Sequence, residues 1–288
     1  MRYHAPATFD EAVTIAAGAQ GVTRFLAGGT DVLVQLRLGS VTPDDLIDLK
    51  HIPGAREVTR RPDGGWHIGA AVASVDLAAH PGLAADWPGV VEAMGLVGST
   101  QVQGRATLTG NLCNGSPAAD SVPALVAAGA TVTIHGQGVS RELPVEAVPL
   151  KPGKTVLGSG ELISAITLPP RGTYGGDAYL RFIPRTEMDI AVVGCAVNLR
   201  LDGSTITEAR VALGAVAPTV LLSPEGAEAI LGTRLDEAAL EKLAQAAEAA
   251  CKPIDDKRGT VAFRTDVAGV LARRAARIAY DRAGRDRA

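Results

Sequence analysis

The pattern of apolar and polar positions changes part-way along the chain. Up to about residue 175, short apolar runs typical of strands alternate with helical stretches, whereas beyond it the strand-like runs come first and the helical stretches follow. The predicted strands are 23–26, 46–49, 66–69, 131–135, 162–168, 178–182, 190–199 and 206–213. The predicted helices are 9–18, 32–38, 75–79, 117–128, 224–231, 235–250 and 261–282. This mixture predicts an α+β fold.

Polar residues beside these runs indicate where elements begin and turn. Thr8 and Ser74 each precede a helical stretch and are predicted to cap it with a side-chain oxygen. The sequence Asp202-Gly203-Ser204 is typical of a hairpin turn. The run 23–26 is apolar enough to predict a buried strand. Residues 98–120 show no period and are predicted to form a long loop, which in a compact domain is usually functional or disordered.

The change of pattern near residue 175 also predicts the domain organisation. We expect a first α/β unit over residues 1–55 and a second over residues 56–175. An α+β unit with a three-stranded sheet and helices is expected over residues 176–288. Its last helix carries several arginines that indicate a solvated basic face, with a docking surface as the alternative: Arg273, Arg274, Arg277 and Arg282.

Composition and charge exclude several classes of protein. The chain has 288 residues, of which 47% are hydrophobic and 20% charged, as in ordinary globular proteins. A net charge of −3 gives the chain no excess of positive charge that would favour binding to nucleic acid. No apolar run is long enough to span a membrane, and the N-terminal residues lack the apolar segment of a signal peptide. We therefore expect a cytoplasmic protein.

The cysteines and histidines predict neither a metal site nor a catalytic residue. Cys113, Cys195 and Cys251 lie far apart, and three thiols cannot complete a four-cysteine site. The five histidines show no metal-ligand spacing. Cys113 lies among polar residues and is a candidate to touch a ligand, but the sequence shows no histidine paired with it. Redox chemistry in this chain would therefore need a bound organic cofactor.

A first candidate segment follows the strand 23–26. Ala27-Gly28-Gly29-Thr30-Asp31 contains two glycines and opens a helix, so its N–H groups could bind a phosphate. A plain glycine turn, with Asp31 as the helix cap, is the alternative. If a phosphate binds here, we expect a branched side chain at Gly28 to meet it.

The second candidate segment lies within the long predicted loop, over residues 103–120. It contains many short side chains that form hydrogen bonds: Thr107, Thr109, Asn111, Asn114 and Ser116. Pro117 suits the first turn of a helix that continues to about residue 128. Asp120 would then lie in the first turn, where its charge is stabilised, and could also bind a sugar hydroxyl.

Common nucleotide and hydrolase motifs do not account for these segments. Gly110 to Gly115 has the spacing of a phosphate-binding P-loop, but Ser116-Pro117 follows in place of Lys-Ser or Lys-Thr. No G-x-G-x-x-G follows a strand, and the chain has no G-x-S-x-G.

Together the two segments resemble the FAD-binding medium subunit of molybdenum hydroxylases, the family of bacterial xanthine and carbon monoxide dehydrogenases. Both characteristic motifs are present, AGGTD at 27–31 and ATLTGNLCNGSPAAD at 106–120. The stretches 180–191, 212–218 and 256–264 resemble further signatures of the family, so the resemblance extends along the whole chain.

The resemblance implies an FAD-binding fold of the vanillyl-alcohol-oxidase (PCMH) type. Two α/β subdomains would hold the flavin, followed by a C-terminal domain of the CO dehydrogenase flavoprotein type. A first loop, residues 26–33, and a second loop, residues 107–111, would bind the pyrophosphate. The residues that the resemblance implies at the cofactor are Leu26, Ala27, Gly28, Gly29, Thr30, Asp31, Val32, Leu33, Val97, Thr107, Leu108, Thr109, Gly110, Asn111, Asp120, Ile163, Arg181 and Asp189.

The resemblance also implies particular roles, and the chain departs from the family pattern at two places. Asp120 would form a hydrogen bond with the cofactor, and Asp189 would lie near the reactive side of the flavin. The two departures are Thr109-Gly110, where a double glycine is usual, and Val97, where some relatives have an aromatic residue. Arg181 stands where some relatives have lysine. Lysine and arginine are not equivalent donors.

The function implied is electron transfer. FAD would be bound non-covalently, since neither loop contains a histidine. A large subunit would carry the molybdenum cofactor and a small subunit the [2Fe–2S] clusters, in a dimer of heterotrimers. Electrons would leave to an external acceptor such as NAD⁺ or a quinone. The alternatives are a self-contained FAD oxidoreductase of the same fold and a non-catalytic nucleotide-binding module.

Overall fold

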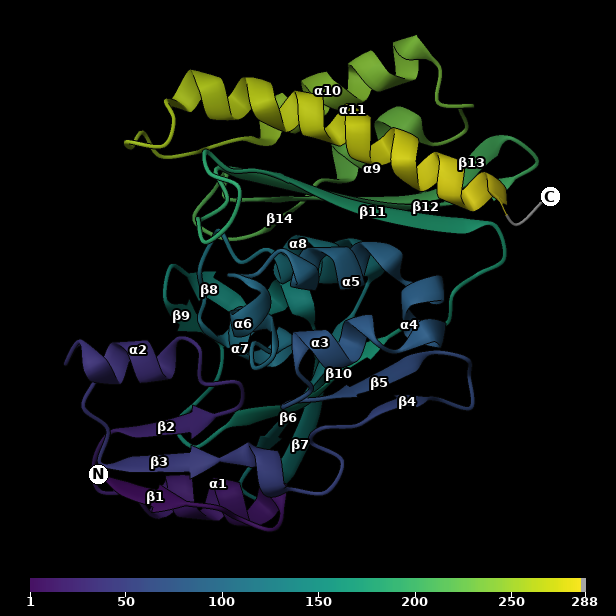
Figure 1. Cartoon of the computed structure of the whole chain (residues 1–288). Helices are drawn as coiled ribbons and strands as arrows, with labels where there is room; N and C mark the ends of the chain where they lie inside the picture. Colours follow the sequence, from purple (N-terminus) through teal and green to yellow (C-terminus); the bar gives the residue numbers. More distant parts are fainter. Residues whose placement is uncertain (286–288) are drawn as a thin grey trace.

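Three main sheets organise the chain, each built from its own stretch of sequence (Figure 1). The computed structural model describes residues 1–285. The strands of the three sheets lie within residues 2–48, 58–168 and 175–222. The predicted division at residues 55 and 175 stays a prediction, and residues 286–288 of the predicted third unit lie outside the described residues.

The strands and helices of the described residues are as follows. The strands are β1 (Arg2–His4), β2 (Thr23–Leu26), β3 (Asp45–Asp48), β4 (Val58–Arg60), β5 (Trp66–Gly69), β6 (Thr131–Gly136), β7 (Val139–Pro144), β8 (Pro149–Lys151), β9 (Lys154–Thr155), β10 (Leu162–Leu168), β11 (Gly175–Phe182), β12 (Val193–Asp202), β13 (Thr205–Gly214) and β14 (Leu221–Leu222). The helices are α1 (Phe9–Gly18), α2 (Val32–Arg37), α3 (Ser74–Ala78), α4 (Pro81–Asp86), α5 (Pro88–Gly95), α6 (Thr100–Gln103), α7 (Leu108–Cys113), α8 (Ser121–Ala128), α9 (Pro224–Ile230), α10 (Glu237–Ala250) and α11 (Val261–Arg285), with short 3-10 turns η1 (Leu49–His51) and η2 (Val145–Ala147).

The first sheet is parallel and small, with β3 between β1 and β2. Helix α1 begins where the sequence predicts, because the Thr8 hydroxyl accepts the N–H of Glu11 at 3.1 Å. The prediction of a buried strand at 23–26 is wrong in one respect: of its residues only Leu26 is buried. Strand β2 is an edge strand of the sheet, so most of its side chains keep some exposure.

The second sheet is entirely antiparallel, in the order β4-β5-β10-β6-β7. The predicted loop over 98–120 in fact contains the short helices α6 and α7, which span too few residues to show a helical period. The helix predicted from Pro117 begins only at Ser121. Ser74 does not cap a helix but lies inside α3, where its hydroxyl donates to the Met94 carbonyl at 3.0 Å.

The C-terminal sheet packs on both of its faces. Helices α9 and α11 cover one face, with α10 packed against these two helices, and α5 and α8 of the preceding unit cover the other face (Figure 1). The sheet has a fourth strand beyond the predicted three, because the two residues of β14 pair with β13. Tyr179, Ala196 and Ala212 of this sheet belong to the same hydrophobic core as α8. The second and third units are therefore joined by a shared core.

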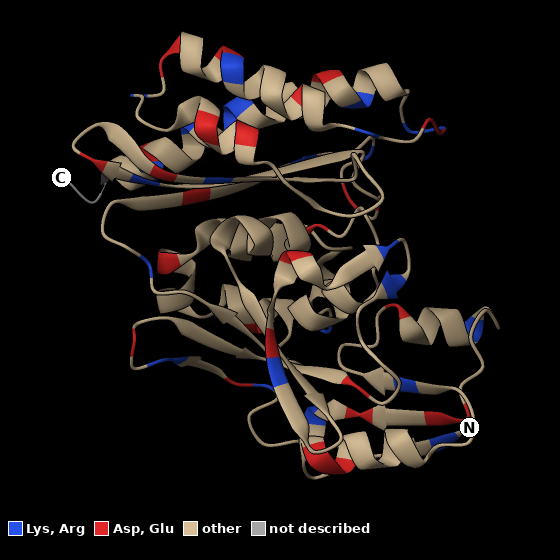
Figure 2. Cartoon of the chain, turned by 180° about the vertical axis from the view of Figure 1, so that it is seen from behind, with Lys and Arg blue, Asp and Glu red and all other residues tan. Residues whose placement is uncertain are grey.

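Three of the four arginines predicted to form a basic face on α11 form ion pairs within the chain. Arg273 and Arg277 both pair with Glu237 of α10, and Arg282 pairs with Glu92 of α5. Figure 2 shows acidic and basic positions interspersed on these C-terminal helices. Over residues 1–285, no helix has the length and apolar character needed to cross a membrane.

Candidate functional site

A cleft of about 820 Å³ separates the first sheet from the second unit. One wall is formed by β2 and residues 27–32, and the other by α7 and the segment 157–163. Its volume is within the usual range for sites that hold small molecules and cofactors. Both sequence motifs therefore meet at one cleft.

The first loop is held by its backbone. Gly29 has φ +83°, a conformation that favours glycine. A Cβ at Gly28 would lie 2.1 Å from the carbonyl oxygen of Arg105, and the Arg105 Nε donates to the Gly28 carbonyl at 3.2 Å. The expectation that a branched side chain at Gly28 would meet a phosphate is therefore wrong, because it would first meet the backbone just before the second loop.

The start of α2 differs from the prediction in its cap. Asp31 occupies the N-cap position, but its side chain accepts no capping hydrogen bond. Asp31 lines the cleft, where partial desolvation raises the pKa of its carboxyl. The helix itself is lightly packed, since none of its residues is buried.

The second loop is held by side chains. The Thr107 hydroxyl accepts the N–H of Gly110 at 2.9 Å and so caps α7. The Asn111 side-chain oxygen accepts both the N–H of Ser121, at 3.2 Å, and its hydroxyl, at 2.6 Å. Thr109 and Gly110 then face the cleft. The cap takes up the N–H of Gly110, whereas the N–H groups of Leu108 and Thr109 have no partner inside the helix and are available to an anion.

Asp120 lies at the N-terminus of α8 and pairs with the C-terminal sheet. One carboxylate oxygen accepts from the Tyr179 hydroxyl at 2.9 Å and the other from Arg181 Nη1 at 2.7 Å. Burial raises the pKa of Asp120, although Arg181 and Tyr179 act against the shift. Sequence reasoning missed Tyr179, for which the signal is its spacing of two from Arg181 on one face of a strand.

Asp189 joins two loops of the C-terminal domain. Its carboxylate accepts from Arg185 Nε and Arg258 Nε, both at 3.2 Å, and from the N–H of Ile190 at 2.8 Å. These donors lower its pKa to about 2, led by Arg185. Asp189 does not line the cleft.

Residues 1–171 match the family model described as the FAD binding domain in molybdopterin dehydrogenase. The chain belongs to this family of FAD-binding subunits. Residues 178–279 match the CO dehydrogenase flavoprotein C-terminal domain. The resemblance found from the motifs is thereby confirmed, as are the fold class and FAD as the cofactor of this FAD-binding subunit.

Similar proteins agree with this assignment over nearly the whole chain. The carbon monoxide dehydrogenase medium chain of Hydrogenophaga pseudoflava is 33% identical over 282 residues, 98% of each chain. The putative xanthine dehydrogenase FAD-binding subunit of Escherichia coli K12 is 30% identical over 91% of this chain and 90% of its own. A solved structure of the Hydrogenophaga carbon monoxide dehydrogenase superposes with a TM-score of 0.93 at 32% identity, covering 98% of both chains.

The residues that line the cleft fit FAD chemically. Glycine backbone and the start of a helix offer N–H groups, which suit a pyrophosphate. The carboxylate of Glu161, which also faces the cleft, is neutralised by Arg141. The thiol of Cys113 lines the cleft as well, and burial raises its pKa to about 12, so it is a neutral group at pH 7.

This FAD-binding subunit brings only part of the predicted site together. The predicted residues that line the cleft are Ala27, Gly28, Gly29, Thr30, Asp31, Val32, Thr109, Gly110 and Ile163. Those outside its lining are Leu26, Leu33, Val97, Thr107, Leu108, Asn111, Asp120, Arg181 and Asp189. Sequence reasoning missed the lining residues of β2 and the turn at 158–160, because no motif marks them. The cofactor contacts themselves stay predictions.

Proposed function

We propose that this chain carries non-covalently bound FAD in the cleft as the electron-transfer subunit of a heteromeric molybdenum hydroxylase. The complex would pass electrons from [2Fe–2S] clusters of a small partner subunit to an external acceptor, and a large subunit would hold the molybdenum cofactor. FAD supplies the capacity to exchange electrons singly or in pairs. The observation that carries the proposal is the meeting of the first and second loops at one cleft in a member of this family.

The role we assign to the chain's own residues is to bind and orient the cofactor. The first and second loops would hold the pyrophosphate through N–H groups, each bond contributing roughly 1.5–3 kcal/mol to a charged acceptor. Ile163 lies on the cleft, where it would contact the cofactor. Asp120 and Arg181 hold α8 in place and, with it, the second loop. Val97 and Asp189 would act on the cofactor from outside the cleft lining.

The names of similar proteins support the proposal that this chain binds partner subunits. A protein called the medium chain of carbon monoxide dehydrogenase is a subunit among others, and this chain covers 98% of it. A solved structure of a copper- and molybdenum-containing CO dehydrogenase matches this chain with a TM-score of 0.92 at 31% identity. We infer that large and small subunits bind this chain, in a dimer of heterotrimers.

Co-expression with the products of neighbouring genes tests the proposal. We expect the chain to purify yellow, with equimolar FAD, together with a molybdenum subunit and an iron–sulfur subunit. A chain that binds FAD but never associates with such subunits would contradict it. Steady-state turnover by the isolated chain would instead favour a self-contained oxidoreductase.

A further inference from the structure

Helix α8 lies between the second loop and the C-terminal sheet, and all of its residues are buried. At its N-terminus, Asp120 is held by Tyr179 and Arg181 of β11. The N–H and hydroxyl of Ser121, in its first turn, both donate to Asn111 of α7. Any shift of α8 along its axis would therefore move α7 and the second loop with it.

The C-terminus of α8 is held by the same sheet. The Val126 carbonyl accepts from Arg210 Nε at 3.1 Å and from Arg210 Nη2 at 2.9 Å, in addition to the N–H of Gly129 at 3.1 Å. The Ala127 carbonyl accepts from Asn198 Nδ2 at 3.2 Å. Carbonyls of a last helical turn lack partners within the helix and carry partial negative charge, so an arginine suits them.

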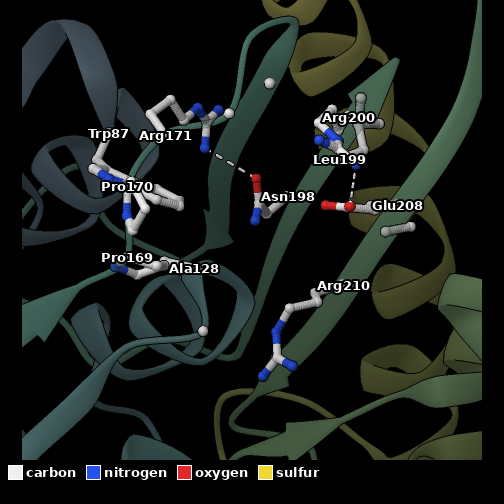
Figure 3. A pocket seen from close by; sticks show the side chains of 14 residues that line it. Trp87, Ala128, Pro169, Pro170, Arg171, Asn198, Leu199, Arg200, Glu208 and Arg210 are labelled. Carbon is white, nitrogen blue, oxygen red and sulfur yellow. Dashed lines mark hydrogen bonds and ion pairs between the residues drawn. The ribbon is translucent and has the colours of Figure 1, made fainter. Parts of the chain in front are cut away.

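The neighbouring pair of residues on the sheet makes no such contact. Asn198 and Arg210 are opposite each other on β12 and β13, and Arg200 and Glu208 are opposite each other two residues along the strands. All four line a cavity of about 350 Å³ between the two units (Figure 3). Arg200 pairs with Glu208, whereas Figure 3 shows Arg210 directed away from that pair.

We propose that Arg210 and Asn198 are positioning residues for FAD, which act through α8 on the second loop. The route is a continuous set of bonded groups from β13 to the cleft: Arg210, Val126, the helix, Ser121, Asn111 and then Thr109 and Gly110. A helix of eight residues is about 12 Å long, so neither Arg210 nor Asn198 needs to touch the cofactor. This inference rests on the proposed place of FAD in the cleft.

Titration of the full chain with FAD, followed by flavin fluorescence, tests the inference. Arg210→Met is expected to raise the Kd for FAD about five- to tenfold, and Asn198→Leu about threefold. Arg210→Lys restores a charged donor to the helix end, so its Kd should lie between those of wild type and Arg210→Met. At saturating FAD, the visible circular dichroism of the bound flavin should change in Arg210→Met, which a loss of stability alone would not produce.

Two matched variants separate the contact with the helix from nearby charges. Arg200→Met removes an arginine from the same sheet face without touching α8, and Glu146→Gln removes the ion-pair partner of Arg210 while leaving its bonds to Val126. Both should bind FAD as wild type does. Equal weakening in either control, or wild-type Kd and dichroism in Arg210→Met, would overturn the inference. If Arg210→Met does not fold, Asn198→Leu decides by the same measurements.

A variant within the cleft distinguishes failure of this inference from failure of the proposed site. Thr109→Asp places a carboxylate beside the proposed pyrophosphate position and should weaken FAD strongly. If it does so while Arg210→Met has no effect, only the positioning role fails. If Thr109→Asp leaves the Kd unchanged, the proposed site is wrong, and any effect of Arg210→Met then contradicts the route through α8 as well.

Discussion

The two walls of the cleft are stabilised in different ways. The first loop depends on backbone packing at Gly28 and opens into α2, a helix with no buried residue. The second loop depends on side-chain hydrogen bonds from Thr107 and Asn111 and leads into α8, whose residues are all buried. The first wall therefore depends on a close backbone contact, and the second on a network anchored in the C-terminal sheet.

The largest effect is expected from Gly28→Val. A Cβ there would lie 2.1 Å from the Arg105 carbonyl oxygen, a backbone atom that cannot easily move. The two loops would separate, so FAD binding should be lost, and the unfolding free energy should fall by about 3 kcal/mol. FAD titration and urea unfolding measure both.

Gly18→Ala is the control for this variant. A Cβ at Gly18 meets nothing within 4 Å, so its stability and FAD affinity should match wild type or slightly exceed it. Full FAD occupancy in Gly28→Val would show that the contact between the loops does not shape the site.

Arg181→Met tests the network of the second wall. It leaves the Asp120 carboxylate buried with Tyr179 as its remaining partner, and removing one member of a buried pair typically costs about 3 kcal/mol. Unfolding free energies measured by denaturant titration should show this loss at neutral pH. The loss should shrink with Asp120→Asn added to the same chain, and a loss that stays undiminished would contradict the pairing.

A pH dependence is expected behind the second wall, at Asp177 of β11. Burial raises the pKa of this carboxyl to about 6, against the effect of Arg171 and Arg282, with Glu92 adding to the rise. A carboxyl whose folded pKa exceeds its unfolded value favours folding at low pH. That contribution is lost as the pH rises through the folded pKa, so the unfolding free energy should fall by up to about 3 kcal/mol between about pH 4 and pH 7.

Asp177→Asn should remove that slope. Several charged and polar groups face Asp177. They are the side chain of Arg171, the backbone N–H of Gly89 and the carboxylate of Glu92, both on α5, and the side chain of Arg282 on α11. Denaturant unfolding across the same pH range measures the difference between the two chains. An unchanged slope in the variant would assign the pH dependence to another group.

The smallest effect is expected at an exposed side chain next to the first wall, and it is compared with the effect at a buried side chain of the second wall. Leu38, just after α2, is 75% exposed, so Leu38→Ala should change stability by less than about 0.5 kcal/mol. Leu125 of α8 is fully buried, and Leu125→Ala should cost about 3 kcal/mol. Equal costs at the two positions, measured by urea unfolding, would contradict the contrast between the walls.

Local signals in the sequence predicted much of the fold. Helix α1 and strands β5 and β10 lie where apolar periods and a capping threonine placed them. Helices α6 and α7 could not be recognised in the same way, because four to six residues do not complete a period. Strand β14 consists of two residues and depends on pairing with β13.

The candidate site could be predicted from the sequence only in part, for a similar reason. The motifs at 27–31 and 106–120 identify the loops because glycine and short polar residues are needed locally. The partners of Asp120 are 59 and 61 residues away, and the contact between Gly28 and Arg105 spans 77. Such contacts depend on how the sheets pack, which no local pattern encodes.

The most direct measurement of the central claim is the FAD affinity of Thr109→Asp beside Thr109→Val, in the full chain. Valine keeps the shape of threonine without its hydroxyl, whereas aspartate adds a negative charge, so the pair separates the effect of charge from that of losing the hydroxyl. If the pyrophosphate lies between the first and second loops, Thr109→Asp should bind FAD at least about thirtyfold more weakly than wild type, and Thr109→Val within about threefold. Equal affinity of both variants and wild type would contradict the claim that this cleft holds the flavin.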